Sequence, residues 1–282
     1  MGKATLSVLI FFFIVVTGCK KDSGSSPENL AKEDLTDLRY GVNASQTLDV
    51  YLPANRSDQT KTIIFVHGGF WIGGDKDELA DIAKQFRDKG YTAISINYRL
   101  ANTAENNIHP AQVNDLRDAI TFIQEKAGEW NISADKLALA GASAGGHIAL
   151  LYTYAYDTRN NIQTVISLAG PTDLTNMQGA SAQQAQVVRW FLGANANTPA
   201  SVFQEASPIT HVSAGTKPTL LFHGKLDVVV PYQQSVDLKA KLDQFGVKNE
   251  LVTYENLGHE ADLNAVPGLI EKIDEWLNVV MR

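Results

Sequence analysis

Five short apolar runs without internal alternation set the predicted architecture of the chain. They occupy residues 62–66 (TIIFV), 92–96 (TAISI), 137–140 (LALA), 164–169 (TVISLA) and 219–223 (TLLFH). Runs of this kind are typical of strands buried on both faces of a parallel sheet. Two more strands are predicted: residues 47–52, where apolar and polar positions alternate, and residues 249–254.

Helical segments separate these strands. They are predicted at residues 75–89, 110–127, 144–156, 231–245 and 267–280. Asp75, with Glu78 three residues later, has the pattern of a helix start, and Gly90 stands where that helix is predicted to end. The alternation indicates an α/β fold with a mostly parallel, doubly wound sheet flanked by helices. In such a sheet the binding loops lie at the carboxyl ends of the strands.

Length, composition and charge narrow the possible classes. With 282 residues, 44% of them apolar, the chain can bury one large core, and one α/β domain is predicted over residues 41–282. Residues 171–215 break the alternation and predict a short insertion that caps the site. The alternative is a surface excursion with a small core of its own. The net charge of −7, without a basic cluster beyond Lys20 and Lys21, argues against a nucleic-acid partner.

The amino-terminal segment has the pattern of an export signal. Lys3 precedes the apolar run 6–16, which is too short to span a bilayer but has the length of a signal-peptide core. The residues before Cys19 read VTG, which resembles a bacterial lipobox. This resemblance implies a signal peptide over residues 1–18, lipidation of Cys19, and an exported protein whose only membrane attachment is its lipid anchor. The alternative is an ordinary secretory signal.

Two features support the lipoprotein interpretation. Cys19 is the single cysteine of the chain, so it has no partner for an internal disulfide. The residues that follow it (KKDSGSSP, 20–27) have the polar, Gly/Ser-rich composition of a flexible linker, and a tether is predicted over residues 19–40. The sequence specifies neither the oligomeric state nor the membrane that carries the anchor.

The pentapeptide GASAG (141–145) carries the strongest chemical signal. It places Ser143 between Gly141 and Gly145, where an apolar strand gives way to a helix rich in small residues. This is the layout of a nucleophile elbow, in which a strained turn exposes the serine hydroxyl and the flanking glycines avoid a clash. The alternative is a Gly/Ser-rich loop without a chemical role.

A nucleophilic serine needs a base, and the base needs an orienting group. In this strand–turn–helix context the chain order is serine, acid, histidine. Asp227 follows the strand 219–223, and His259 is the one histidine beyond it, so these residues are the predicted acid and base. Asp173, one strand earlier, is the rival acid. Of the other histidines that follow Ser143, which are His147, His211 and His223, His223 is expected to be structural and His147 to pack beneath the site.

The segment HGGFWIGGD (67–75) follows the strand 62–66 and is a candidate oxyanion site. Backbone N–H groups of such a glycine-rich loop, with that of the residue after the nucleophile, can bind a tetrahedral oxyanion. The predicted donors are Gly69, Phe70 and Ala144. Trp71 and Trp190 are candidate walls of the substrate pocket, although burial in the core is the alternative for Trp71.

Together these segments resemble the carboxylesterase and hormone-sensitive-lipase-like branch of the α/β-hydrolases. The resemblance rests on HGGFW, NYRL (97–100), GASAGGH, ASPI (206–209), HGKLDVVVP and LGHE, and it covers residues 41–282. It implies an α/β-hydrolase fold and hydrolysis of a carboxylic ester through an acyl-serine, with no cofactor. Isolated histidines and the lack of a second cysteine give no support to a metal site.

The substrate class stays partly open. The HGG-aromatic-Trp form is also similar to feruloyl and acetyl-xylan-type esterases and to arylformamidases. We therefore expect a small-molecule or carbohydrate ester carrying a short or aromatic acyl group, with an arylformamidase-like amide hydrolase as the alternative. A non-catalytic surface lipoprotein with the same fold is a further alternative, because fold alone does not fix function. The full set of candidate catalytic residues favours an enzyme.

Overall fold

A computed structural model describes residues 1–2, 30–175, 181–259 and 266–282, and the statements below concern these residues. The strands are β1 (Glu33–Arg39), β2 (Thr47–Leu52), β3 (Thr62–Val66), β4 (Thr92–Ile96), β5 (Leu137–Ala142), β6 (Ile162–Leu168), β7 (Thr219–Gly224) and β8 (Asn249–Tyr254). The α-helices are α1 (Ala80–Asp88), α2 (Ala111–Trp130), α3 (Ala144–Leu151), α4 (Ala182–Leu192), α5 (Ala200–Glu205), α6 (Gln233–Gln244) and α7 (Leu269–Val280). The 3₁₀ turns are η1 (Lys76–Leu79) and η3 (Pro208–His211), and η2 (Tyr152–Tyr156) is a π-helical turn.

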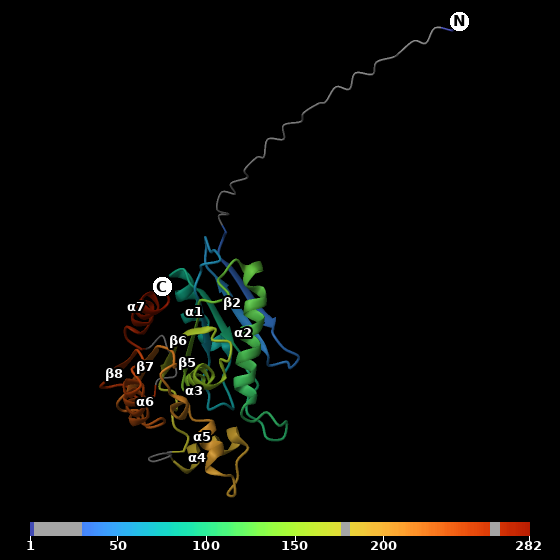
Figure 1. The fold of residues 1–282 in the computed structure, drawn as a ribbon. Helices are drawn as coiled ribbons and strands as arrows, with labels where there is room; N and C mark the ends of the chain where they lie inside the picture. The colour runs from blue at the N-terminus through green and yellow to red at the C-terminus, as the bar shows by residue number, and fades with distance from the viewer. Residues whose placement is uncertain (3–29, 176–180, 260–265) are drawn as a thin grey trace.

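All eight described strands form one sheet in the order β1-β2-β4-β3-β5-β6-β7-β8. Figure 1 shows this sheet between the helices. The pairs β1/β2 and β2/β4 are antiparallel, and every pair from β4 to β8 is parallel. The predicted doubly wound α/β architecture is thereby confirmed. The seven predicted strands are all present. Because β3 lies between β4 and β5 in the sheet, the connection from β3 to β4 and the connection from β4 to β5 run in opposite directions across it.

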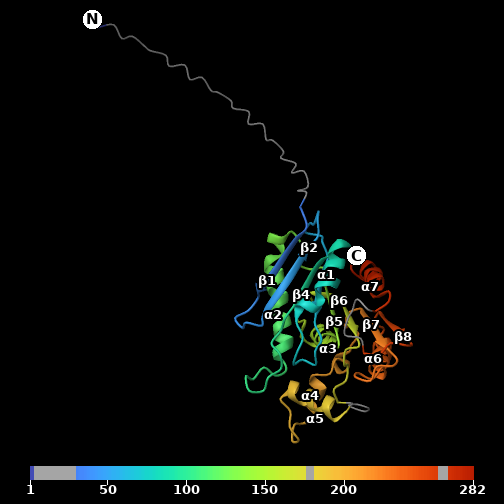
Figure 2. The ribbon, with the colours of Figure 1, turned by 180° about the vertical axis from the view of Figure 1, so that it is seen from behind.

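Helices cover both faces of the sheet (Figures 1 and 2). Consecutive residues of β3 show the consequence: Ile64 and Val66 belong to the cluster packed under α2, α3 and α6, whereas Ile63 and Phe65 belong to the one under α1 and α7. All four side chains are fully buried. This two-sided burial is why the strands appear in the sequence as uninterrupted apolar runs.

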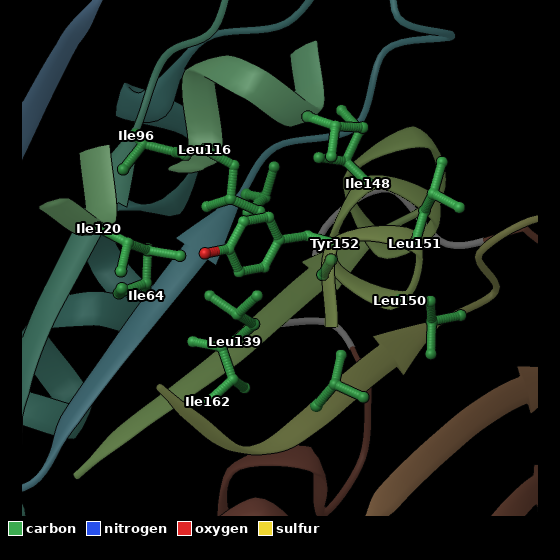
Figure 3. Close-up of a cluster of buried hydrophobic side chains, with 14 of the residues drawn as sticks. Ile64, Ile96, Leu116, Ile120, Leu139, Ile148, Leu150, Leu151, Tyr152 and Ile162 are labelled. Carbon is green, nitrogen blue, oxygen red and sulfur yellow. The ribbon is translucent and has the colours of Figure 1, made fainter. Parts of the chain in front are cut away.

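Figure 3 shows the core on the α2 and α3 side of the sheet. The ring of Tyr152 lies among aliphatic side chains of strands and helices, including Ile64, Leu116 and Leu139. Tyr152 begins η2, so the helix predicted over residues 144–156 consists of α3 and a π-helical turn. Among the described residues no helix is both long and apolar enough to cross a bilayer.

The tether predicted over residues 19–40 ends too late, because Glu33–Arg39 forms β1. This edge strand has mostly exposed side chains, so its sequence lacks the apolar alternation of a half-buried strand. Backbone pairing with β2 and ion pairs from Lys76 to Asp37 and from Arg87 to Asp34 hold it in place. Cys19 and the predicted signal sequence lie outside the described residues, apart from residues 1–2.

The segment predicted as an insertion contains α4, α5 and η3. Figure 2 shows α4 and α5 together at one end of the molecule. Ser181 and Gln184 form a reciprocal capping box at the start of α4. Four apolar side chains of α4, among them the fully buried Phe191, belong to the main core cluster. The described part of the insertion is therefore packed onto the α/β core, and within it no separate small core is formed.

Candidate active site

Ser143 lies in a strained turn between β5 and α3. Its backbone has φ 51° and ψ −121°, a conformation that is costly for a residue with a side chain. A methyl group at Gly141 would overlap the backbone of Gly145, and one at Gly145 would overlap the carbonyl oxygens of Val66 and His67. The two glycines therefore let the helix begin directly against the ends of β5 and β3, which is the geometry expected of a nucleophile elbow.

The structure brings together the three residues that the sequence singled out for an acid–base–nucleophile chain. The ring nitrogen Nε2 of His259 lies 2.9 Å from Ser143 Oγ, and its Nδ1 lies 2.7 Å from Asp227 Oδ2. Asp227 follows β7, and His259 follows β8. The rival acid, Asp173, accepts hydrogen bonds from Thr175, so the carboxylate in contact with His259 is that of Asp227.

Asp227 is held by donors on both of its oxygens. Oδ1 accepts the backbone N–H groups of Val229 and Val230 at 2.8 Å, and Oδ2 accepts from His259 and from His223 Nε2 at 3.1 Å. Burial by itself raises the pKa of this carboxyl, but the hydrogen bonds from His223, His259 and the backbone outweigh it and hold the pKa well below its ordinary value. Asp227 is therefore ionised at neutral pH.

His223 is a site residue that sequence reasoning placed outside the site. Its side chain is fully buried, Nε2 faces both Asp227 Oδ2 and the carbonyl of Val230 at 2.9 Å, and Nδ1 lies 2.7 Å from Ser235 Oγ. Two acceptors at Nε2 place the proton there, so the Ser235 hydroxyl donates to Nδ1. The sequence HGKLD could have indicated this role, because a tight turn brings its first and last residues, His223 and Asp227, into contact.

The glycine-rich loop after β3 has three consecutive residues in the left-handed region. Gly69, Phe70 and Trp71 have φ of 101°, 56° and 61°. The loop closes on itself, because the N–H groups of Ile72 and Gly73 both donate to the carbonyl of Gly69 at 3.1 and 2.9 Å. The N–H groups of the predicted oxyanion donors Gly69, Phe70 and Ala144 donate no hydrogen bond within the described part of the chain.

Tyr98 holds this loop, which runs close beside Ser143. The hydroxyl of Tyr98, in the NYRL segment, donates to the carbonyls of His67 and Gly68 at 3.1 and 3.3 Å, and its ring stacks on His67. A methyl group at Gly68 would lie 3.5 Å from Ser143 Cβ. The loop therefore runs past the serine with little space between them.

Trp71 is not a wall of an open pocket, because the structure buries it in the core, where it is 3% exposed. It stacks on Phe191 of α4, and its Nε1–H donates to His147 Nδ1 at 3.2 Å. His147 Nε2 donates in turn to the carbonyl of Ala206 at 2.8 Å. This arrangement agrees with the expectation that His147 packs beneath the site, and it joins the loop, α3 and the insertion.

His147 is neutral in the folded protein. Burial lowers its pKa to about 3, and the hydrogen bond to Ala206 acts in the opposite direction without cancelling the effect. The other candidate wall, Trp190, is 49% exposed and lines a surface cavity together with Ile72. Within the described ranges no group of three or more His, Cys, Asp or Glu side chains is arranged to hold a metal ion.

Fold and site together define the class of protein. The sheet is mostly parallel, a serine lies on a strained turn after β5, and an aspartate and a histidine follow later strands. This combination is the arrangement of an α/β-hydrolase. The chain belongs to the BD-FAE family, which it matches over residues 48–242. The family match and the related solved structures confirm the predicted α/β-hydrolase fold.

Similar proteins of known name are mostly esterases. The chain is 28% identical over 243 residues to a probable carboxylic ester hydrolase, LipM, of Mycobacterium tuberculosis, with 78% of this chain and 54% of LipM covered. It is 30% identical over 156 residues to kynurenine formamidase of Danio rerio, with 54% of this chain and 51% of that protein covered. It therefore spans about half the length of these two relatives.

A truncated carbohydrate esterase from gut microbiota has a similar structure, with a TM-score of 0.78 and 23% identity. The alignment covers 90% of this chain and 98% of the esterase. At this level of identity the likeness supports the fold, and the activity has to be argued from the site.

Proposed function

We propose that this protein is a carboxylic ester hydrolase that works through an acyl-enzyme on Ser143. The observation that carries the proposal is the continuous hydrogen-bond chain from Ser143 through His259 to Asp227, with contacts of 2.9 and 2.7 Å. The elbow backbone at Ser143 and the names of the similar proteins support it. A surface protein that only binds its ligand would not need this arrangement.

Proton positions follow from the acceptors. Asp227 is ionised, so His259 carries its proton on Nδ1 and presents the lone pair of Nε2 to the Ser143 hydroxyl. When Oγ attacks the ester carbonyl, Nε2 takes the serine proton and the carbonyl oxygen becomes an oxyanion. The Asp227 carboxylate stabilises the resulting imidazolium and is not itself protonated.

The oxyanion is stabilised by backbone N–H groups, and the proton held by His259 is passed on when the alcohol leaves. We assign the oxyanion donors as the N–H groups of Gly69 and Phe70, which follow Gly68 in the loop beside Ser143, and of Ala144, the residue after the serine; these N–H groups have no hydrogen-bond partner in the described chain. His259 then donates its Nε2 proton to the leaving alcohol as the carbon–oxygen bond breaks, which leaves an acyl group on Oγ. Water, deprotonated by His259, hydrolyses this acyl-enzyme and regenerates the serine.

For the substrate we propose an ester with a short acyl group or a feruloyl group, and in particular acetyl or feruloyl on a carbohydrate. Phe70 is 40% exposed beside the assigned oxyanion donors and offers a face to a small or aromatic acyl group. In the described part of the insertion Trp190 is the one large apolar side chain that is exposed, so this segment offers little continuous apolar surface to a long chain. The structural relative named as a carbohydrate esterase supports the carbohydrate part.

The experiment is a series of 4-nitrophenyl esters from acetate to octanoate, measured with the wild type and Ser143→Ala. Each buried methylene contributes about 0.8 kcal/mol, so a lipase pocket would give kcat/KM that climbs with chain length. We expect a maximum at about two to four carbons, covalent labelling of Ser143 by a fluorophosphonate, and loss of activity in Ser143→Ala. Full activity of the variant would refute the acyl-serine mechanism, and a maximum at octanoate would refute the substrate assignment.

The similarity to kynurenine formamidase raises a second candidate, hydrolysis of an aryl formamide by the same residues. The acyl-serine chemistry is the same, but the leaving group is an arylamine. Measuring kcat/KM for N-formylkynurenine beside that for 4-nitrophenyl acetate separates the two. A higher value for the formamide than for every ester would favour the second candidate.

We further propose that the protein is exported and attached to a bacterial membrane through lipidated Cys19, on the strength of the lipobox-like residues that precede it. Two or more acyl chains on one residue give stable attachment, whereas a single chain gives marginal binding. An ester hydrolase at that location would meet extracellular polymers, which agrees with a carbohydrate ester as the substrate.

A further inference from the structure

A cavity of about 400 Å³ lies between the glycine-rich loop after β3, the loop after β4 and helix α4. Ile72 and Leu100 form an apolar part of its wall, and Trp190 lines it from α4. Most of the remaining lining residues are amides and hydroxyls, including Asn43 and Asn102. The reaction proposed above uses none of these side chains.

The glycine-rich loop after β3 connects this cavity with the candidate active site, because Ile72 of its wall and the predicted oxyanion donor Gly69 lie in the same loop. Ile72 is only three residues from Gly69, which limits the separation of their backbones to about 11 Å. The loop after β4 is attached to the same segment, because the N–H of Ala101 donates to the carbonyl of Trp71 at 2.7 Å. On the opposite side, Phe191 packs its ring against Trp71, which positions the neighbouring Trp190. One loop segment therefore supplies both a predicted oxyanion donor, Gly69, and part of the cavity wall, Ile72.

The side chains have the composition of a site for a polyhydroxylated ring. Trp190 is 49% exposed, and an indole face attracts the slightly positive C–H groups of a sugar. Asn43 and Asn102 use their Oδ1 atoms to accept backbone N–H groups of Ser45 and Ala104. Their Nδ2 groups are thereby oriented as donors, for which hydroxyl oxygens are suitable acceptors.

Charge restricts the ligand further. Glu105 contributes a carboxylate to the cavity, where it accepts from Asn107, and the described lining contains neither lysine nor arginine. A sugar acid would place its carboxylate near that of Glu105 without a cation to balance them. An uncharged sugar encounters no such repulsion.

We propose that this cavity binds the uncharged sugar rings of the alcohol part of the substrate, with Trp190 as the stacking platform. The proposal rests on the ester hydrolase function proposed above and specifies where its leaving group is held. It assigns the acyl group to the side of Phe70 and the sugar to the side of Ile72.

Binding can be measured apart from catalysis. The full chain carrying Ser143→Ala is titrated with xylotetraose, a neutral probe, and with tetragalacturonate, a charged one, by isothermal titration calorimetry. We expect the neutral probe to bind and the charged one to bind at least tenfold more weakly. Adding Trp190→Ala should weaken binding of xylotetraose at least tenfold, about 1.4 kcal/mol, and Trp190→Phe should restore most of it. Phe245→Ala, another exposed aromatic residue at the end of α6, is the matched control and should not change binding.

Kinetics give a second measurement. In the otherwise wild-type chain, Trp190→Ala should lower the ratio of kcat/KM for acetylated xylotetraose to that for 4-nitrophenyl acetate at least tenfold. Equal binding of xylotetraose by the Trp190 variants, stronger binding of tetragalacturonate, or an unchanged ratio would overturn the proposal. Trp190-dependent binding in a chain that hydrolyses no ester would refute the proposed function alone, and ester hydrolysis without such binding would refute the cavity assignment alone.

Discussion

Acidification should destabilise this protein through His147, and His147→Gln should remove much of that effect. The folded pKa of His147 is lowered to about 3 by burial, whereas an unfolded histidine titrates near 6.5. Between these values the unfolded chain binds a proton that the folded chain excludes. Stability is therefore unaffected by this group above about pH 6.5 and is lost progressively as the pH falls toward 3.

The magnitude follows from the size of the window. Each pH unit corresponds to about 1.4 kcal/mol, so lowering the pH from 7 to 4.5 should remove about 3 kcal/mol through His147 alone. The side chain is fully buried, so solvent screening does not reduce this value. Asp227 contributes little in this window, because its folded pKa is depressed and its stabilising effect is lost only as the pH falls below about 4.

Glutamine is suited to this test because it keeps both hydrogen bonds without the titration. Its amide oxygen can accept from Trp71 Nε1–H, and its amide nitrogen can donate to the carbonyl of Ala206, as the two ring nitrogens of His147 do. One amide hydrogen remains unpaired, which should cost about 1 kcal/mol at pH 7.

Urea unfolding of both proteins, followed by tryptophan fluorescence at pH 7 and pH 4.5, gives the four free energies of unfolding that are needed. We expect the wild type to lose about 3 kcal/mol more than His147→Gln between the two pH values. Equal losses would refute the reasoning, because they would show that His147 takes up a proton in the folded state.

Three further changes test other parts of the structure. Gly145→Ala should lower the free energy of unfolding by about 1–3 kcal/mol and reduce kcat, because the added methyl overlaps the backbone at the end of β3. The control Gly128→Ala, in open space on α2, should be neutral or raise the melting temperature slightly. His223→Phe removes a donor from Asp227 and should move the acidic limb of the kcat/KM–pH profile to higher pH, and an unmoved limb would contradict this role. Cys19→Ser should transfer the protein from the membrane fraction to the soluble one, and unchanged fractionation would contradict the lipid anchor.

Most of the sheet could be predicted because its central strands are buried on both faces. Such strands need apolar residues at every position, and this pattern is visible without knowledge of their neighbours. β1 was not visible, since its backbone pairing with β2 and its ion pairs hold it, and charged side chains such as Asp34 and Asp37 do not indicate a strand. The conformation of an edge strand depends on the partner that it pairs with.

The candidate site was predictable to the extent that chain order and local turns specify it. Ser143, Asp227 and His259 could be selected because each follows a strand whose carboxyl end lies at the same edge of the sheet. The burial of Trp71 could not be predicted from chain order or local turns. It depends on Phe191, which is distant in the sequence and reaches Trp71 only because α4 packs back onto the core.

The packing of Trp71 also explains how a strained loop can persist beside Ser143. Phe70, Trp71 and Ser143 all have positive φ, and each such residue costs on the order of 1–3 kcal/mol. Burying the indole of Trp71 against Phe191 contributes about 2–3 kcal/mol, and hydrogen bonds from Tyr98 and to His147 add to it. Because α4 supplies Phe191 for this packing and Trp190 for the cavity, one helix of the insertion both stabilises the loop and borders the proposed sugar site. A substitution that displaces α4 should therefore affect the loop conformation and sugar binding together.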